Sequence, residues 1–152
     1  MPKVKLAKIS SYDLNDQIVK VIHKWRFEDY KHMFKSEKVP TFNEHLKYLV
    51  TEIDSENTHW LGAFSKKKLV GCFSLKIEKR RSIIKVELGR LMVDPDCTGK
   101  GIGKELIKHA IEYSSLALKG KILWLEVLEH NKRAIKLYDR EGFKAKWTGT
   151  EA

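Results

Sequence analysis

The hydrophobic residues in the first third of the chain recur with two different periods. Apolar and polar side chains alternate over residues 4–9, which is typical of a half-buried strand. Apolar residues then recur at helical spacing between Leu14 and Trp25, and a second short helix is expected at about residues 28–34. Thr41 and Glu44 form a T-x-x-E capping pattern that predicts the start of another helix. The apolar face of that helix contains Phe42, Leu46, Leu49 and Ile53.

From residue 59 onward the pattern predicts mainly strands. Three strand-like runs cover residues 59–65, 69–77 and 83–93, and the short turns between them favour antiparallel neighbours. A glycine-rich loop then leads into an amphipathic helix, whose buried face is expected to contain Ile102, Leu106, Ile107, Ala110, Ile111 and Leu118. A strand at 121–128, a helix at 131–140 and a short strand at 143–147 complete the order. The sequence therefore predicts one α/β domain over residues 1–152, antiparallel at first and parallel at the end.

The charge of the chain favours an anionic partner. Thirty basic and 20 acidic residues give a formal net charge of +10 over 152 residues. Nucleic acid, a membrane surface and a phosphate-bearing small molecule would all suit this charge. The basic clusters at residues 66–68 and 79–81 lack interleaved aromatic residues, so solvated turns explain them more simply than a nucleic-acid surface. Nucleic acid is therefore not the expected partner.

Three other classes of protein are also not expected. No run of apolar residues is long enough to cross a membrane, and the first residues lack the apolar core of a secretory signal. Cys72 and Cys97 have no C-x-x-C spacing, so we interpret them as reduced thiols of a cytoplasmic protein. The six histidines show no metal-ligand spacing, and no metal site is expected.

The segment from Val93 to Lys104 is expected to bind phosphate. Gly99, Gly101 and Gly103 stand at alternate positions between a predicted strand and a predicted helix. Glycines let a ligand approach the backbone closely, and the start of a helix attracts negative charge. The spacing fits neither the G-x-x-x-x-G-K-[S/T] nor the G-x-G-x-x-G loop. A pyrophosphate loop is one interpretation, and a glycine-rich helix start without a ligand is the other.

This segment resembles motif A of the GNAT family of N-acetyltransferases, which bind acetyl-CoA. In the family pattern [R/Q]-x-x-G-x-[G/A], Gly101 and Gly103 fill the last two positions, and Thr98 replaces the usual arginine or glutamine. The resemblance implies the GNAT fold, with a mixed sheet whose parallel pair splays at the acetyl-CoA site. The residues implied in acetyl-CoA binding are Leu91, Met92, Val93, Thr98, Gly99, Lys100, Gly101, Ile102, Gly103 and Lys104. A bulge at residues 91–93 would offer backbone N–H groups to the thioester oxygen.

A second segment, residues 131–143, resembles the family's motif B, N-x-x-A-x-x-x-Y followed by Gly-Phe. Asn131, Ala134 and Tyr138 are spaced to share one face of a helix. The resemblance implies that Asn131 binds the pantetheine amides, Ala134 leaves room for that arm, and Tyr138 is the general acid for the thiolate. Glu87 is the candidate base, acting through a water molecule. The alternatives are a packing role for Tyr138 and a solvent-facing strand position for Glu87.

The first half of the chain resembles one branch of the family more narrowly. Trp25 and Arg26, together with His45 in the segment Thr41-Phe-Asn-Glu-His45, are similar to acetyltransferases of nucleotide-linked amino sugars of the pseudaminic-acid type. This resemblance implies that the three residues bind the acceptor. The alternatives are a core tryptophan, a surface arginine and a histidine on a helix face.

The expected function is therefore transfer of an acetyl group from acetyl-CoA to a small primary amine, with a nucleotide-linked amino sugar as the leading acceptor. Another amine, a protein N-terminus, and a non-catalytic module that binds acyl-CoA or nucleic acid are the alternatives. Most members of the family have a further long strand after Gly-Phe. Residues 145–152 are too few for it, so this strand is expected to be shortened or absent. Formation of a homodimer stays open.

Overall fold

The computed structural model describes residues 4–10, 16–30 and 39–145. Five strands form one sheet in the order β1-β2-β3-β4-β5. Neighbouring strands are antiparallel from β1 to β4, and β4 and β5 are parallel. The strands are β1 (Lys5–Lys8), β2 (Thr58–Ser65), β3 (Lys68–Arg80), β4 (Ile83–Val93) and β5 (Ile122–Trp124). The prediction of a mixed α/β fold, antiparallel first and parallel last, is confirmed.

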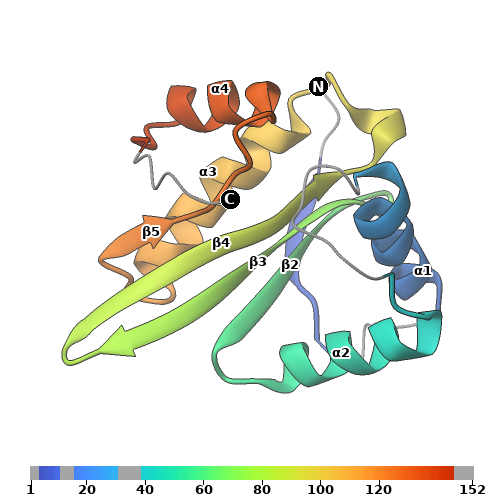
Figure 1. Ribbon diagram of the computed structural model, residues 1–152, viewed down its shortest axis with the longest axis horizontal. Coiled ribbons are helices and arrows are strands. Elements are labelled where there is room, and N and C mark those ends of the chain that lie inside the picture. The colour runs from blue at the N-terminus through green and yellow to red at the C-terminus, as the bar shows by residue number, and fades with distance from the viewer. Residues whose placement is uncertain (1–3, 11–15, 31–38, 146–152) are drawn as a thin grey trace.

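Helices cover both faces of this sheet (Figure 1). One face carries α1 (Asp16–Lys24), its π-helical continuation η1 (Trp25–Asp29) and α2 (Phe42–Asp54). The other face carries α3 (Ile102–Leu116) and α4 (Lys132–Arg140). A short 3₁₀ turn, η3 (Pro95–Cys97), follows β4 and begins the connection to α3.

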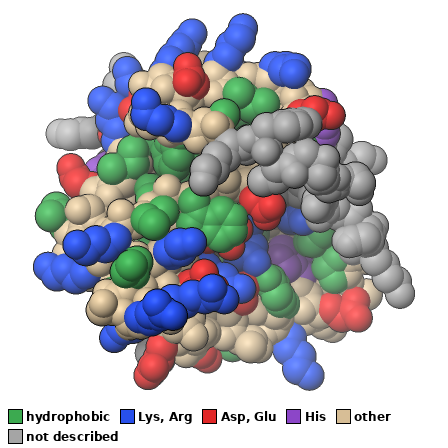
Figure 2. Space-filling model, turned by 60° about the vertical axis from the view of Figure 1, so that its left-hand side comes forward, with side chains coloured by type: hydrophobic (Ala, Val, Ile, Leu, Met, Phe, Trp, Pro, Cys, Tyr) green, Lys and Arg blue, Asp and Glu red, His purple; other side chains and the backbone are tan. Residues whose placement is uncertain are grey.

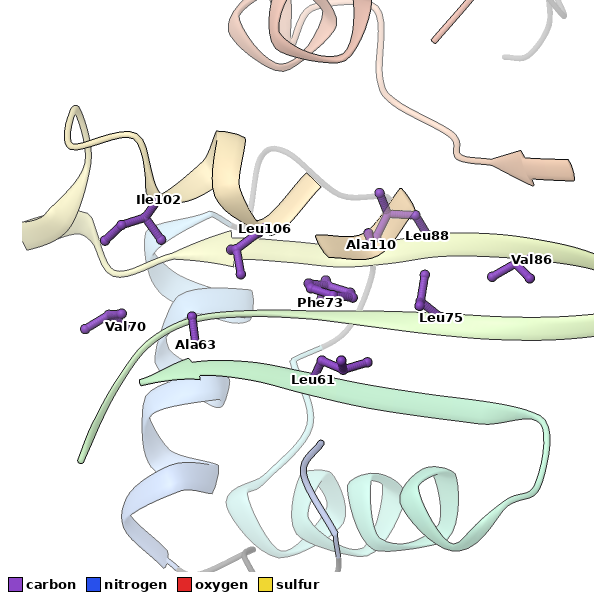
Figure 3. Close-up of a cluster of buried hydrophobic side chains, with 10 residues drawn as sticks. All are labelled: Leu61, Ala63, Val70, Phe73, Leu75, Val86, Leu88, Ile102, Leu106 and Ala110. Atoms are coloured by element: carbon purple, nitrogen blue, oxygen red, sulfur yellow. The ribbon is translucent and has the colours of Figure 1, made fainter. Parts of the chain in front are cut away.

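The sheet separates two hydrophobic cores. Strand side chains alternate between its faces, so each face receives its own apolar set. The α3-side cluster, drawn in Figure 3, consists of Leu61, Ala63, Val70, Phe73, Leu75, Val86, Leu88, Ile102, Leu106 and Ala110. The α1–α2-side cluster consists of Ile9, Val19, Ile22, Trp25, Leu49, Trp60, Leu69, Cys72 and Met92.

The start of α2 forms as its sequence predicts. The Thr41 hydroxyl accepts a hydrogen bond from the Glu44 N–H at 3.2 Å, and the Glu44 carboxylate accepts one from the Thr41 N–H at 2.8 Å. This reciprocal capping box supplies partners for backbone groups that a helix leaves unsatisfied at its first turn. It fixes where α2 begins, and therefore which of its side chains face the sheet.

Several predicted boundaries are wrong. The strand predicted at 121–128 is only β5, because beyond Trp124 no pairing with β4 continues. On α3, Ile111 is 38% exposed and Leu118 lies past the helix end, whereas Ser114 completes the buried stripe at helical spacing. Residues 143–145 form no strand, and Lys146 and Trp147 lie outside the described residues.

The helix predicted at about residues 28–34 is also misplaced. Helical structure continues from α1 through η1 and ends at Asp29, with Tyr30 as the residue that follows it. Residues 31–34 lie outside the described part of the chain, as does Leu14 at the predicted start of the first helix.

The positive charge is spread over the face of the molecule that Figure 2 draws. On the face drawn in Figure 2, lysine and arginine side chains surround hydrophobic ones in several places rather than forming one continuous stripe. Exposed hydrophobic side chains include Ile83, Ile122 and Trp124 at the β5 end of the sheet. Among the described residues, no helix is both long enough and apolar enough to cross a membrane.

Candidate active site

The sheet opens where β5 ends. β4 and β5 pair only through Lys85–Ile122, Val86–Leu123 and Glu87–Trp124. β4 then continues to Val93 paired with β3 but without β5, and the glycine-rich loop and α3 follow it. A long molecule can therefore lie against the backbone of β4 on the side that β5 leaves. The splayed parallel pair that the family resemblance implied is present.

A β-bulge distorts β4 at this opening. Cys72 of β3 faces Met92, whereas Ser74 faces Gly89, so β4 contains one residue more than β3 between these pairs. Arg90 takes up the irregularity with a left-handed φ of 50°. The bulge was predicted at residues 91–93, and the structure places it slightly earlier, between Gly89 and Met92.

The glycine-rich loop presents an open helix N-terminus. Gly99 and Gly101 have left-handed φ angles of 80° and 81°, a conformation that favours glycine. Gly101 is the N-cap of α3, and no described side chain caps this end. The first N–H groups of α3 are therefore available to an anion, and the helix dipole adds partial positive charge. Lys100 and Lys104 are exposed beside the loop.

Two residues predicted to bind acetyl-CoA also make internal hydrogen bonds. The Thr98 hydroxyl donates to the Pro95 carbonyl at 3.1 Å and closes the turn before the loop. The Asn131 side-chain oxygen accepts from the Ala134 N–H at 3.3 Å and caps α4. Thr98 thus helps to shape the loop, and the amide N–H groups of Asn131 make no hydrogen bond to another described residue.

Tyr138 and Glu87 lie on opposite faces of the sheet. Tyr138 of α4 packs against the α3-side cluster and makes an edge contact with Phe143, with ring centroids 5.6 Å apart. Val86 and Leu88 point into that same cluster, so Glu87 between them points to the other face. The two groups can therefore act on different sides of one bound thioester.

The environments of the two groups shift their acidities. Burial raises the pKa of Tyr138 to about 12, which keeps its hydroxyl protonated at neutral pH. Burial, followed by the nearby Glu126 carboxylate, raises the pKa of Glu87 above its usual value, while Lys76 and Arg90 oppose this rise. A less acidic carboxyl group is a stronger proton acceptor when it is ionised.

A hollow of about 470 Å³ lies on the α1–α2 side of the sheet. Its wall includes Arg26, His45, Tyr48, Trp60, Arg90 and Met92. Arg26 and His45, both predicted from the sequence, come together here. Trp25 does not line this hollow. It is only 3% exposed and belongs to the α1–α2-side cluster.

The sequence reading missed Tyr48, Trp60 and Arg90. Arg90 carried a signal, because it interrupts an otherwise apolar stretch of a buried strand. Tyr48 and Trp60 look like ordinary positions of an amphipathic helix and a strand, so no local pattern marks them.

The hollow is lined by two arginines, the carboxylate-bearing Glu44 and a neutral histidine. The Nδ1 atoms of His23 and His45 lie 2.9 Å apart, so one ring donates a hydrogen bond to the other. Burial is the main cause that lowers the pKa of His45 to about 4, and electrostatic repulsion from His23, Arg26 and Arg90 adds to it. His45 therefore stays uncharged at neutral pH, and the arginines carry the positive charge of the hollow wall.

An opened sheet beside an uncapped, glycine-led helix suits the binding of a phosphate-bearing molecule along one strand. The chain belongs to the acetyltransferase (GNAT) family, whose sequence model matches residues 19–143. Members of this family use acetyl-CoA as the donor, so the chain is an acetyl-CoA-dependent N-acetyltransferase. The described residues contain no group of three or more His, Cys, Asp or Glu side chains placed to hold a metal ion.

Two curated relatives differ in what they are named for. The chain is 28% identical to the acetyltransferase PseH of Campylobacter jejuni over 139 residues, which cover 91% of this chain and 85% of PseH. It is 31% identical to the ribosomal protein bS18-alanine N-acetyltransferase of Salmonella typhimurium over 121 residues, which cover 78% of this chain and 71% of that enzyme.

Solved structures share the fold at low sequence identity. An aminoglycoside acetyltransferase from an uncultured soil metagenomic sample, in complex with trehalose, matches with a TM-score of 0.78 at 16% identity. The match covers 98% of this chain and 93% of the other. At this identity the likeness establishes the fold and leaves the acceptor open.

Gly101→Val is expected to abolish the binding of acetyl-CoA, because a branched side chain would block the approach of a pyrophosphate to the loop. In the parent protein, acetyl-CoA at 100 times its Kd should stabilise the folded state by about 2.7 kcal/mol. This stabilisation is measurable as an increase in Tm. Gly142→Val is the matched control, since Gly142 also has a left-handed φ (99°) and an added Cβ there meets no atom within 4 Å. An equal acetyl-CoA-induced Tm shift in Gly101→Val would contradict the loop assignment.

The depressed pKa of His45 predicts a loss of stability in acid. The unfolded chain binds a proton at a pKa near ~6.5, whereas folded His45 does so only near pH 4. Between these values the unfolded state holds more protons, so the free energy of unfolding should fall as the pH falls from about 6.5 to about 4. Urea titrations across this range should show a smaller decline for His45→Asn than for the parent. An equal decline in the free energy of unfolding for the two proteins would mean that the pKa of His45 is not lowered in the folded state.

Proposed function

We propose that this acetyltransferase acts on the primary amine of a nucleotide-linked amino sugar, which binds in the hollow beside β4. The observation that carries the proposal is the meeting of Arg26 and His45 in one hollow, whose wall reaches β4 through Arg90 and Met92. These two residues come from separate segments, and both belong to the pattern of the amino-sugar branch. The similarity to PseH over 91% of the chain supports the same branch.

The chemistry of the hollow suits such an acceptor. An arginine can hold a diphosphate through two parallel, charge-assisted hydrogen bonds. Tyr48 and Phe27 offer aromatic faces at the hollow, and Tyr48 is 45% exposed. A sugar or a nucleotide base packs well on such faces. The net charge of +10 favours capture of an anionic acceptor over a cationic one.

The donor occupies the opposite side in this proposal. The N–H groups at the start of α3, with Lys100 and Lys104, hold the pyrophosphate of acetyl-CoA. Asn131 and Ala134 line the path of the pantetheine arm. Acetyl-CoA supplies an activated acetyl group as a thioester, and the backbone of β4 holds that group in the opening beyond Trp124.

Two side chains then move the protons. The acceptor amine is an ammonium ion with a pKa near ~10, and it must lose a proton before it can attack. Glu87 takes this proton through a water molecule. The amine nitrogen bonds to the acetyl carbon, the carbon–sulfur bond breaks, and Tyr138 gives its proton to the departing sulfur. The nitrogen loses a second proton as the amide forms, and that proton restores the Tyr138 hydroxyl.

A protein N-terminus is the second candidate acceptor. The 31% identity to the bS18-alanine N-acetyltransferase over 78% of the chain favours it. A peptide acceptor carries no diphosphate, so it makes no diphosphate contact with Arg26. The dependence of the rate on Arg26 and on salt therefore separates the two acceptors.

Tyr138→Phe should lower kcat while leaving the affinity for acetyl-CoA intact, because it removes only the proton donor. A fall of roughly 10²–10⁴-fold is expected if proton transfer to sulfur limits the reaction. Thiol release measures the rate, and the acetyl-CoA-induced Tm shift measures binding. Tyr113→Phe is the matched control, since Tyr113 is a half-buried tyrosine on α3 that contacts His59. A kcat within twofold of the parent would make Tyr138 a packing residue.

Arg26→Ala should raise KM for a nucleoside-diphosphate amino sugar by at least about tenfold, the effect of losing one charge-assisted interaction of ~1.5 kcal/mol. The affinity for acetyl-CoA should not change. In the parent, kcat/KM should decrease as ionic strength rises, because salt screens attraction between the acceptor and the basic protein.

The control for Arg26→Ala is Lys79→Ala, which removes an exposed charge on β3 away from the hollow. A best acceptor that is a peptide or a polyamine would overturn the amino-sugar proposal. An unchanged KM in Arg26→Ala would do the same.

A further inference from the structure

Arg90 holds a backbone conformation that its own chemistry disfavours. Its φ of 50° lies in the left-handed region, which costs a side-chain-bearing residue free energy relative to ordinary backbone. It sits at the β-bulge where β4 has one more residue than β3. Such a conformation persists only where the surroundings hold it. The contacts of the Arg90 side chain provide that restraint.

The guanidinium of Arg90 joins a polar cluster that spans α2, β2, β3 and β4. It donates to the Glu52 carboxylate at 3.0 Å, to the Ser74 hydroxyl at 3.1 Å and to the Tyr48 hydroxyl. It also lies over the rings of Trp60 and Tyr48, at 5.2 and 5.5 Å from their centroids.

Glu52 closes this cluster. Its second oxygen accepts from the Trp60 indole N–H at 3.1 Å, and the Tyr48 hydroxyl donates to the first at 2.7 Å. The side chains of Arg90 and Glu52 are only 29% and 18% exposed, so solvent and salt screen their ion pair weakly. The Arg90 side chain, which projects from the bulge, is therefore held in place at its guanidinium.

The bulge also turns two backbone carbonyls toward β3. The Gly89 carbonyl accepts from the Ser74 hydroxyl at 3.3 Å, and the Arg90 carbonyl accepts from the Cys72 thiol at 3.7 Å. In a trans peptide the N–H points opposite to the carbonyl. The N–H groups of Arg90 and Leu91 therefore both point away from Ser74 and Cys72. Two successive N–H groups on one side form a concave site for a negatively charged oxygen.

We propose that Arg90 is a positioning residue for acetyl transfer. Its clamp on Glu52, Ser74 and Tyr48 holds the bulge so that the N–H groups of Arg90 and Leu91 face the thioester oxygen and stabilise its developing charge. The Arg90 side chain itself lies on the acceptor side and does not touch the reacting carbonyl. This inference rests on the proposed placement of the thioester in the opening of the sheet.

The test measures the thioester carbonyl of bound acetyl-CoA directly and requires no amine acceptor. Infrared difference spectra of acetyl-CoA labelled with ¹³C at the carbonyl carbon are recorded free and bound to the parent, Arg90→Lys and Arg90→Ala. Hydrogen bonding to the carbonyl lowers its stretching frequency. The parent should show a downshift on binding, Arg90→Lys a smaller one and Arg90→Ala almost none, while all three retain their affinity for acetyl-CoA. The intermediate result for lysine is expected because one ammonium group cannot reproduce the fork of contacts.

Val19→Ala is the control for general loosening of the fold. Val19 is fully buried in the α1–α2-side cluster but does not line the hollow, so its truncation destabilises the protein without touching the clamp. Val19→Ala should show the same downshift of the carbonyl stretching frequency of bound acetyl-CoA as the parent. On any amine that proves active, kcat should fall by about tenfold or more in Arg90→Ala, since loss of one oxyanion donor lowers kcat by ~10²–10³-fold. KM for acetyl-CoA should stay within twofold.

The outcomes separate the inference from the function on which it rests. A parent band that does not move on binding would reject the placement of the thioester, and this proposal with it. A parent downshift that persists unchanged in both Arg90 variants would reject only the role of Arg90. The role of Arg90 would also be rejected if Val19→Ala lost as much of the downshift as Arg90→Ala does. It would likewise be rejected if Arg90→Lys no longer bound acetyl-CoA.

Discussion

The separation of β4 from β5 is the constraint on which the rest of the site depends. Up to Glu87 and Trp124 the two strands pair as ordinary parallel neighbours, and beyond that point β4 continues without β5. A strand that loses its neighbour exposes backbone donors and acceptors that need other partners. In the proposed function, acetyl-CoA supplies them. The bulge at Gly89–Met92 and the glycine-led start of α3 both lie on this unpaired stretch and its continuation.

The sheet also divides the chemistry between its two faces. Tyr138 belongs to the face covered by α3 and α4, whereas Arg26, His45 and Arg90 lie around the hollow on the face covered by α1 and α2. Donor and acceptor can thus approach one opening from separate sides. The electrostatics agree with this division. The hollow combines two arginines with an uncharged His45, while burial keeps the hydroxyl of Tyr138 protonated.

The fold by itself does not choose the acceptor. Solved structures that share it at a TM-score of 0.78 and 16% identity include an aminoglycoside acetyltransferase, and the curated relatives include an enzyme named for a ribosomal protein alanine. The residues that would distinguish acceptors lie on η1, α2 and the bulge, outside the loop that the family pattern marks. The choice of acceptor therefore depends on a few side chains, whereas the fold that positions them is shared.

The sequence by itself determined the features that depend on neighbouring residues. The T-x-x-E box fixed the start of α2, strand-like runs bounded by short basic turns located β2 to β4, and the glycines at 99 and 101 marked the left-handed loop. Capping, strand propensity and φ preference all act over a few residues. Only the tertiary structure decided that Trp25 enters the core while Arg26 beside it lines the hollow. It alone brought Glu52 to Arg90 and ended β5 at Trp124. Those outcomes depend on strand register and on packing between distant segments, which local patterns do not encode.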